Sequence, residues 1–74
     1  MPRYFLHVRD IKETIDTEGI ELAGVGEARS EAIRAAGEAL SEYGHKFWHG
    51  PELKLWMTDE SGNTVCALHI SADC

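Results

Sequence analysis

The sequence lacks the features that stabilise small secreted proteins or anchor proteins in membranes. Only two cysteines, Cys66 and Cys74, occur among its 74 residues, and two cysteines do not make a disulfide framework. No apolar run approaches the ~20 residues that span a bilayer, and the first ten residues carry no signal-peptide pattern. These absences predict a cytoplasmic protein with no membrane association, folded as one domain over residues 1–74.

Positive charge is also scarce. Seven lysines and arginines face 13 aspartates and glutamates, which gives a formal net charge of −6. General attraction to a phosphate backbone is therefore not expected, although a local basic patch is compatible with an acidic protein. A chain this short buries only about 60% of the surface of its unfolded form, so its stability is marginal unless something such as self-association adds to it.

The longest periodic stretch, residues 26–43, predicts one amphipathic helix. Apolar residues recur along it at intervals of three and four, and charged residues occupy the other side. Gly44 is a typical residue at the end of a helix. A side made mostly of alanine can lie close against a flat sheet. The predicted buried side comprises Ala28, Ala32, Ile33, Ala36, Ala39, Leu40 and Tyr43.

Alternating apolar and polar residues predict strands over residues 3–9, 53–58 and 63–70. Residues 59–62 predict the hairpin turn that joins the last two strands. Two short apolar pieces within residues 12–22 flank a turn at 16–19, and at least one of them should pair with the first strand. The predicted fold class is α+β, a small and mainly antiparallel sheet in ββαββ order with one helix packed on one face.

Several pieces of the chain also resemble a known family. They are MPRYF (residues 1–5), HVRD (7–10), the step at 19–22, the helix residues 27–29 and 31–32, and the hairpin at 59–62. Together they resemble a family of short, uncharacterised bacterial proteins catalogued as a domain of unknown function. The sequence departs from that pattern at Leu6, where an aromatic residue is common, and in residues 47–49. The resemblance implies a compact α+β domain and supplies no catalytic residues.

The sheet face turned away from the helix is predicted to collect aromatic and basic side chains, with Val65 and Ala67 beside them. Rings interleaved with cations are typical of single-stranded nucleic-acid binders, but no RNA-binding motif accompanies them and the net charge opposes that function. The favoured interpretation is that the rings are covered, either by residues 45–51 folding back with Phe47 and Trp48 or by a second copy of the protein. We call the predicted set the candidate interaction face: Phe5, His7, Arg9, Lys54, Trp56 and His69.

Metal and catalytic sites are not expected. His45 and His49 are four residues apart, but Gly44 and Gly50 bracket them and disfavour a helix there. Cys66 lies inside a predicted strand, where a core role is more common than a reactive thiolate. His7 has no partner at a telling spacing for general-base catalysis. The sequence therefore predicts no enzyme, no metal and no cofactor.

The overall hypothesis is a protein-interaction or self-associating accessory module, with a homodimer or another protein as its partner. The alternative is a small nucleic-acid-associated protein, antitoxin-like or RNA-binding, that uses the open sheet face. Association between proteins should be insensitive to salt, whereas nucleic-acid binding should weaken steeply as salt rises.

Overall fold

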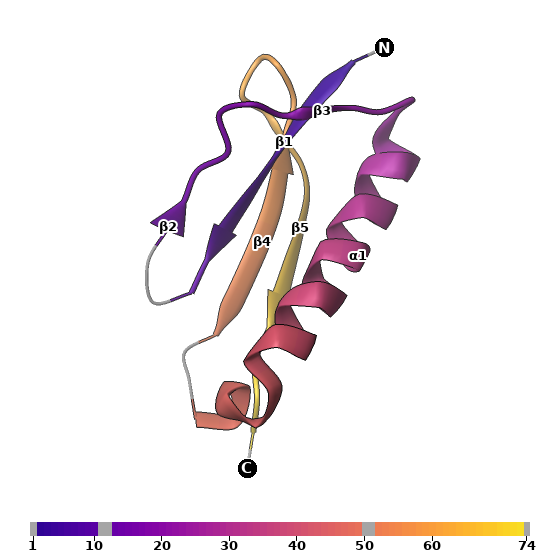
Figure 1. The fold of residues 1–74 in the computed structure, drawn as a ribbon. Coiled ribbons are helices and arrows are strands. Elements are labelled where there is room, and N and C mark those ends of the chain that lie inside the picture. The colour runs from indigo at the N-terminus through magenta and orange to yellow at the C-terminus, as the bar shows by residue number, and fades with distance from the viewer. Residues whose placement is uncertain (1, 11–12, 50–51, 74) are drawn as a thin grey trace.

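A computed structural model describes residues 2–10, 13–49 and 52–73 and confirms the α+β fold class (Figure 1). The elements follow the predicted order, except that the second strand is split into two short pieces. They are β1 (Arg3–Arg9), β2 (Glu13–Thr14), β3 (Ile20–Glu21), α1 (Val25–Tyr43), the 3-10 helix η1 (Gly44–His49), β4 (Leu53–Thr58) and β5 (Thr64–Ile70).

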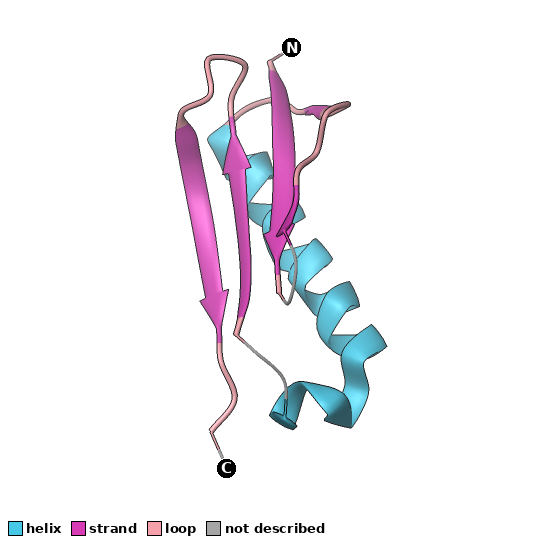
Figure 2. Cartoon of the chain, turned by 90° about the vertical axis from the view of Figure 1, so that its left-hand side faces the viewer, coloured by secondary structure: helices cyan, strands magenta, loops and turns pink. Residues whose placement is uncertain are grey.

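The sheet is antiparallel at every described pairing and has the order β2-β1-β4-β5. β2 and β3 both lie along the outer edge of β1, where Thr14 pairs with Val8 and Ile20 pairs with Tyr4. Both predicted apolar pieces of residues 12–22 therefore pair with the first strand. Figure 2 looks onto the sheet with α1 behind it. In this view β5 forms the edge opposite to β2 and β3.

Helix α1 packs across one face of the sheet through a line of small side chains. Ala28, Ala32 and Ala36 are all buried, as predicted, and Leu55 and Met57 of β4 are buried beneath them. Alanine leaves no long side chain between the layers, so the helix backbone can lie close to the strands. The core thus sits between α1 and the middle of the sheet.

One residue of the predicted buried side is exposed. Ile33 retains 61% of its surface, because it lies about 100° around the helix from the buried Ala32 and projects from the flank of α1 instead of its underside. Ile33 lines one side of a groove beside the edge strand β5. The other side of the groove is formed by Cys66, Ala67 and Leu68 of β5. The prediction for Ile33 was wrong because periodicity alone does not show how narrow the sheet is.

The helix ends as predicted at Gly44, which has a φ of 56° and donates its N–H to the carbonyl of Leu40. A 3-10 helix follows directly, although the sequence interpretation expected no helix across residues 45–49. Phe47 explains the difference, since its ring packs 6.1 Å from that of Tyr43 and against the core cluster that contains Leu53. Burial of this ring favours another turn of helix over an open loop.

The hairpin between β4 and β5 forms as predicted. Oδ1 of Asp59 accepts the N–H groups of Ser61 and Asn63, both at 2.9 Å, and Gly62 has a φ of 88°. A bulge follows, because Met57 pairs with Cys66 while Thr58 already pairs with Thr64. The extra residue, Val65, packs against the core, which corrects its predicted place on the opposite face.

Neither α1 nor η1, within the part of the chain that the structure describes, combines the length and apolar character needed to cross a bilayer.

Candidate interaction face

The strand register brings the predicted face together in rows across the sheet. Lys54 of β4 pairs with Arg9 of β1 on one side and with His69 of β5 on the other. In the next row, Trp56 pairs with His7. Since side chains alternate between faces along a strand, these residues share the side of the sheet opposite to α1, the side seen in Figure 2. Phe5 lies one row further along β1, opposite Thr58.

The row of basic residues borders a shallow hollow of about 470 Å³. Its lining consists of Arg9, Asp10, Glu52, Lys54 and His69. The two permanent cations are thus matched by two carboxylates. Nζ of Lys54 lies 5.2 Å from the centre of the Trp56 ring, within the range of a cation–π contact. The hollow has mixed charge, so it is not a dedicated phosphate site.

His7 is buried, with only 6% of its surface exposed, and so is not part of an open surface. Its Nδ1 accepts the main-chain N–H of Asp16 at 3.1 Å, and its Nε2 lies 2.9 Å from Oγ1 of Thr58. The Trp56 ring lies 5.2 Å away at a tilt of 40°. His7 is therefore a covered member of the predicted face, and both of its ring nitrogens have hydrogen-bond partners.

Asp16 is the residue that sequence reasoning missed. Its carboxylate accepts the N–H groups of Leu6 at 3.2 Å, Glu18 at 3.1 Å and Gly19 at 3.3 Å. Burial alone would raise the pKa of Asp16, but these three hydrogen bonds to its carboxylate outweigh it, so the pKa is lowered. The edge of β1 is unpaired between β2 and β3, and at Leu6 the Asp16 side chain supplies the acceptor that a strand would have supplied.

The sequence did carry a clue to this arrangement. Residues 16–19 were predicted as a turn, and an aspartate that opens a turn commonly accepts the N–H two residues further on. The sequence could not show that the same carboxylate would also reach Leu6, ten residues earlier in the chain.

Phe5 is covered from the same direction. A Cβ atom added at Gly19 would lie 2.9 Å from Cε1 of Phe5 and 2.8 Å from Cγ of Arg3. The chain between β2 and β3 therefore lies directly on Phe5, with only a glycine hydrogen between them. The cover over this half of the face is that segment, residues 13–21.

Residues 45–51, one of the two alternative covers, do not lie over the face as expected in the part that is described. Phe47 packs on the helix side of the sheet, and the neighbouring Trp48 is 54% exposed. Residues 50 and 51 lie outside the described chain.

The sequence matches a known protein family. A family model described as Domain of unknown function (DUF6894) matches residues 3–71 of the 74-residue chain. The chain belongs to the DUF6894 family. The match takes in every helix and strand, which confirms the resemblance drawn from the sequence, and the family description assigns the DUF6894 domain no function. No curated protein and no solved structure matches the chain.

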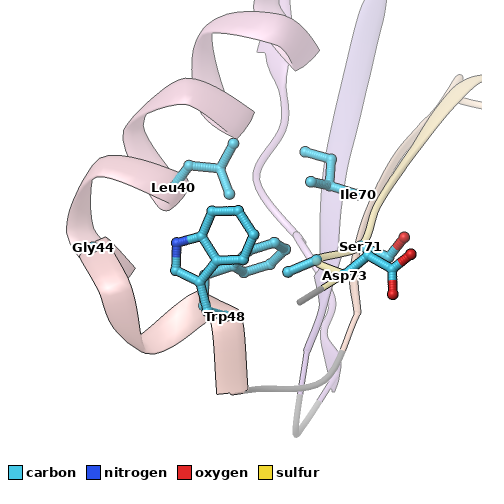
Figure 3. A pocket seen from close by; sticks show the side chains of 8 residues that line it. Leu40, Gly44, Trp48, Ile70, Ser71 and Asp73 are labelled. Carbon is cyan, nitrogen blue, oxygen red and sulfur yellow. The ribbon is translucent and has the colours of Figure 1, made fainter.

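A second hollow of this DUF6894 domain, of about 490 Å³, lies where α1 turns into η1 (Figure 3). Its apolar wall is formed by Leu40, Phe47, Trp48 and Ile70, and residues 71–73 complete it. Figure 3 shows the Trp48 ring beside Leu40, with the Asp73 carboxylate at the rim. The hollow explains how a large ring remains partly exposed at the end of the helix.

No group of three or more histidine, cysteine or acidic residues that could hold a metal occurs within residues 2–10, 13–49 and 52–73. Cys66 packs against the core cluster that contains Tyr4 and Met57, which agrees with its predicted core role. His45 is exposed at the start of η1.

Proposed function

We propose that this DUF6894 domain is a protein-interaction or self-associating module, with no catalysis of its own. The observation that carries the proposal is the one-sided closure of its sheet. Helix α1 covers one face and the short strands β2 and β3 cover one edge. Within the described chain, no strand pairs with the opposite edge at β5, and Trp56 keeps part of its surface exposed.

Trp56 is suited to be an anchor of such a face. Its ring is in contact with the His7 ring and with Nζ of Lys54, each 5.2 Å from its centre. A partner therefore meets a ring that is already positioned, so little side-chain entropy is lost on binding. Tryptophan and arginine are also enriched among the residues that dominate binding energy in protein interfaces, and Arg9 lies one row away.

Sedimentation velocity of the purified chain, from micromolar to millimolar concentration and at low and high salt, tests the proposal. The expected result is association that increases with protein concentration and changes little with salt. A strict monomer across the whole range contradicts the proposed self-association. Loss of association on adding salt would point instead to a contact dominated by charge.

Nucleic-acid binding is the second candidate, and it is favoured by one observation. Lys54 lies over the Trp56 ring in a row with Arg9 and His69, so a base could stack while cations hold phosphates. Asp10 and Glu52 in the same hollow work against it.

Titration of a labelled single-stranded RNA, read by fluorescence anisotropy, tests this candidate. If the chain binds nucleic acid, the binding should weaken steeply as salt rises and should be reduced in Lys54→Gln. Lys46→Gln is the matched control, because Lys46 is exposed on η1, away from the face. Equal binding by both variants, or none by the wild type, would remove nucleic acid from consideration.

A further inference from the structure

The open edge of the sheet is β5, and it lacks the devices that usually keep such edges apart. Apart from the bulge at Val65, its residues 64–70 include no proline, lysine, arginine or acidic residue. Among the described residues only β4 pairs with this strand. Seven residues extend over about 23 Å, which is long enough for a stable ladder with another strand.

The helix layer is open at the same place. Ile33 projects beside β5 with 61% of its surface exposed. A groove of about 230 Å³ runs between the two elements, lined by Arg29, Ala32 and Ile33 of α1 and by Cys66, Ala67 and Leu68 of β5. Its lining is almost wholly apolar apart from Arg29. The backbone of β5 and the side chains of α1 are therefore exposed along the same edge of the molecule.

Charge is distributed so that this edge can approach a copy of itself. At 3.6 residues per turn, Arg29, Ile33 and Leu40 lie on the flank of α1 that faces β5. The acidic residues of α1 lie on the other side of the helix, where Glu31 and Glu38 both pair with Arg34. The nearest acidic residues along the chain, Glu60 and Asp73, lie beyond the two ends of β5. A protein of net charge −6 therefore keeps the middle of this edge free of carboxylates.

We propose that a second copy of the chain pairs with β5, antiparallel and about a two-fold axis, and that the Ile33 side chains meet across that axis. This inference rests on the proposed self-association and names the surface that carries it. Strands pair about 4.8 Å apart, and α1 packs on both β4 and β5. Two helices related in this way lie about 10 Å apart, close to the 8–10 Å of packed helices.

A second copy fits this edge better than an extended peptide does. A peptide strand would satisfy the backbone of β5 but would leave Ile33 exposed in the layer above. An identical chain brings its own helix at the same height, so both layers are filled at once. Gly37, one turn from Ile33, has open space where a Cβ would lie, so a neighbouring helix meets no obstruction there. The assembly would join the two interaction faces into one wider surface and leave Trp56 free.

The test compares two exposed isoleucines by sedimentation velocity. Ile33→Glu should weaken dimerisation at least tenfold, because it places a carboxylate from each copy at the axis. Ile15→Glu is the control, since Ile15 is 52% exposed on the segment between β2 and β3, away from β5. Circular dichroism should show unchanged folding in both variants, because neither side chain belongs to the core.

A second measurement separates strand pairing from a contact between helices alone. Amide hydrogen exchange in residues 64–70 should slow as protein concentration rises, while exchange in residues 3–9 should not. A dimer whose β5 amides exchange at the same rate at every concentration overturns the strand pairing.

The outcomes also separate this inference from the proposed function. A wild-type dimer that survives Ile33→Glu but dissociates in Trp56→Ser would place the contact on the interaction face. It would overturn the β5 inference and leave self-association standing. A wild type that is monomeric at every concentration would overturn both.

Discussion

The main-chain N–H of Asp16 donates to Nδ1 of His7 at 3.1 Å, which fixes the proton of the imidazole on its other nitrogen. Nδ1 must carry a lone pair to accept this bond, so the neutral ring has its proton on Nε2, and Nε2 donates to Oγ1 of Thr58 at 2.9 Å. One buried side chain thereby ties β4 to the segment that covers β1.

Removing the hydroxyl in Thr58→Val should destabilise the domain. The buried Nε2–H would lose its acceptor, and an unsatisfied buried donor costs about 1–3 kcal/mol. Urea denaturation followed by circular dichroism measures the change. Thr64→Val is the control because Thr64 is exposed at the start of β5, and a loss of equal size there would contradict the role assigned to His7.

Asp16 should make stability depend on acidity. Its pKa is lowered from 3.8 in the folded state, so its charged form stabilises the fold above that value, and the contribution is lost as pH falls through the lowered folded pKa. Asp16→Asn should therefore be less stable than the wild type at neutral pH, and the difference should shrink below pH 3.8.

Urea titrations of both proteins at neutral and acidic pH check this dependence. Glu18→Gln is a suitable control, since the Glu18 side chain is exposed on the same turn. A difference between the wild type and Asp16→Asn that is constant with pH would show that charge on Asp16 does not act as described.

Substitution of Gly19 should cost more stability than substitution of Gly62 or Gly37. Gly19 has a φ of 75°, and a Cβ there would lie 2.9 Å from the carbonyl oxygen of Tyr4 as well as against Phe5. Gly19→Ala therefore combines backbone strain with a clash, whereas Gly62→Val, at a φ of 88° but in open space, suffers strain alone.

Gly37→Ala completes the series as a matched control. It should be neutral or stabilising by up to about 1 kcal/mol, because alanine suits a helix interior. Urea titrations at low protein concentration rank the three variants, and equal losses in all of them would mean that the turns are wrongly placed.

The Tyr43 hydroxyl should lose its proton at a higher pH than an ordinary tyrosine does. Its hydroxyl donates to the carboxylate of Asp10, and this bond, with partial burial, raises the pKa of Tyr43 from 10.0 to about 12. The bond contributes fully below pH 10 and is lost as pH rises through about 12, because the raised pKa belongs to the folded state. An ultraviolet absorbance titration should contain a step near pH 12 that is absent in Tyr43→Phe. A step lost near pH 10 in Tyr43→Phe, instead of near pH 12, would show that the bond does not form in solution.

Zinc should not bind tightly. His45 and His49 were the only histidines spaced as metal ligands on a helix, and the described residues bring no third ligand to His45. Calorimetry should detect no binding at micromolar zinc. Micromolar affinity that disappears in His45→Ala and His49→Ala would contradict this prediction.

Much of the fold could be predicted because the long elements carry clear periodicity. The alternation of Leu53, Leu55 and Met57 identified the buried side of β4, and all three are buried. The hairpin was equally clear, since an aspartate opens the turn and Gly62 occupies the left-handed position.

The misplaced features depend on contacts between distant parts of the chain. One of the two expected covers placed Phe47 on the wrong side of the sheet, because nothing near it in sequence shows that Tyr43 and Leu53 provide a better site. His7 had no visible partner because Asp16 and Thr58 reach it only after folding. The residues of the candidate interaction face were brought together as alternation predicted, but the segment lying on Phe5 and His7 could not be foreseen.

The pairing of β1 with β4 also bears on the order in which the chain can fold during synthesis. His7 and Thr58 are 51 residues apart, so the first strand must wait for most of the protein before it meets its long neighbour. Of the strands that pair with it, only β2 and β3 are available earlier among the described residues. The Asp16 turn can therefore occupy one edge of the nascent strand soon after that strand has emerged, and shield it from other unfinished chains before β4 is made.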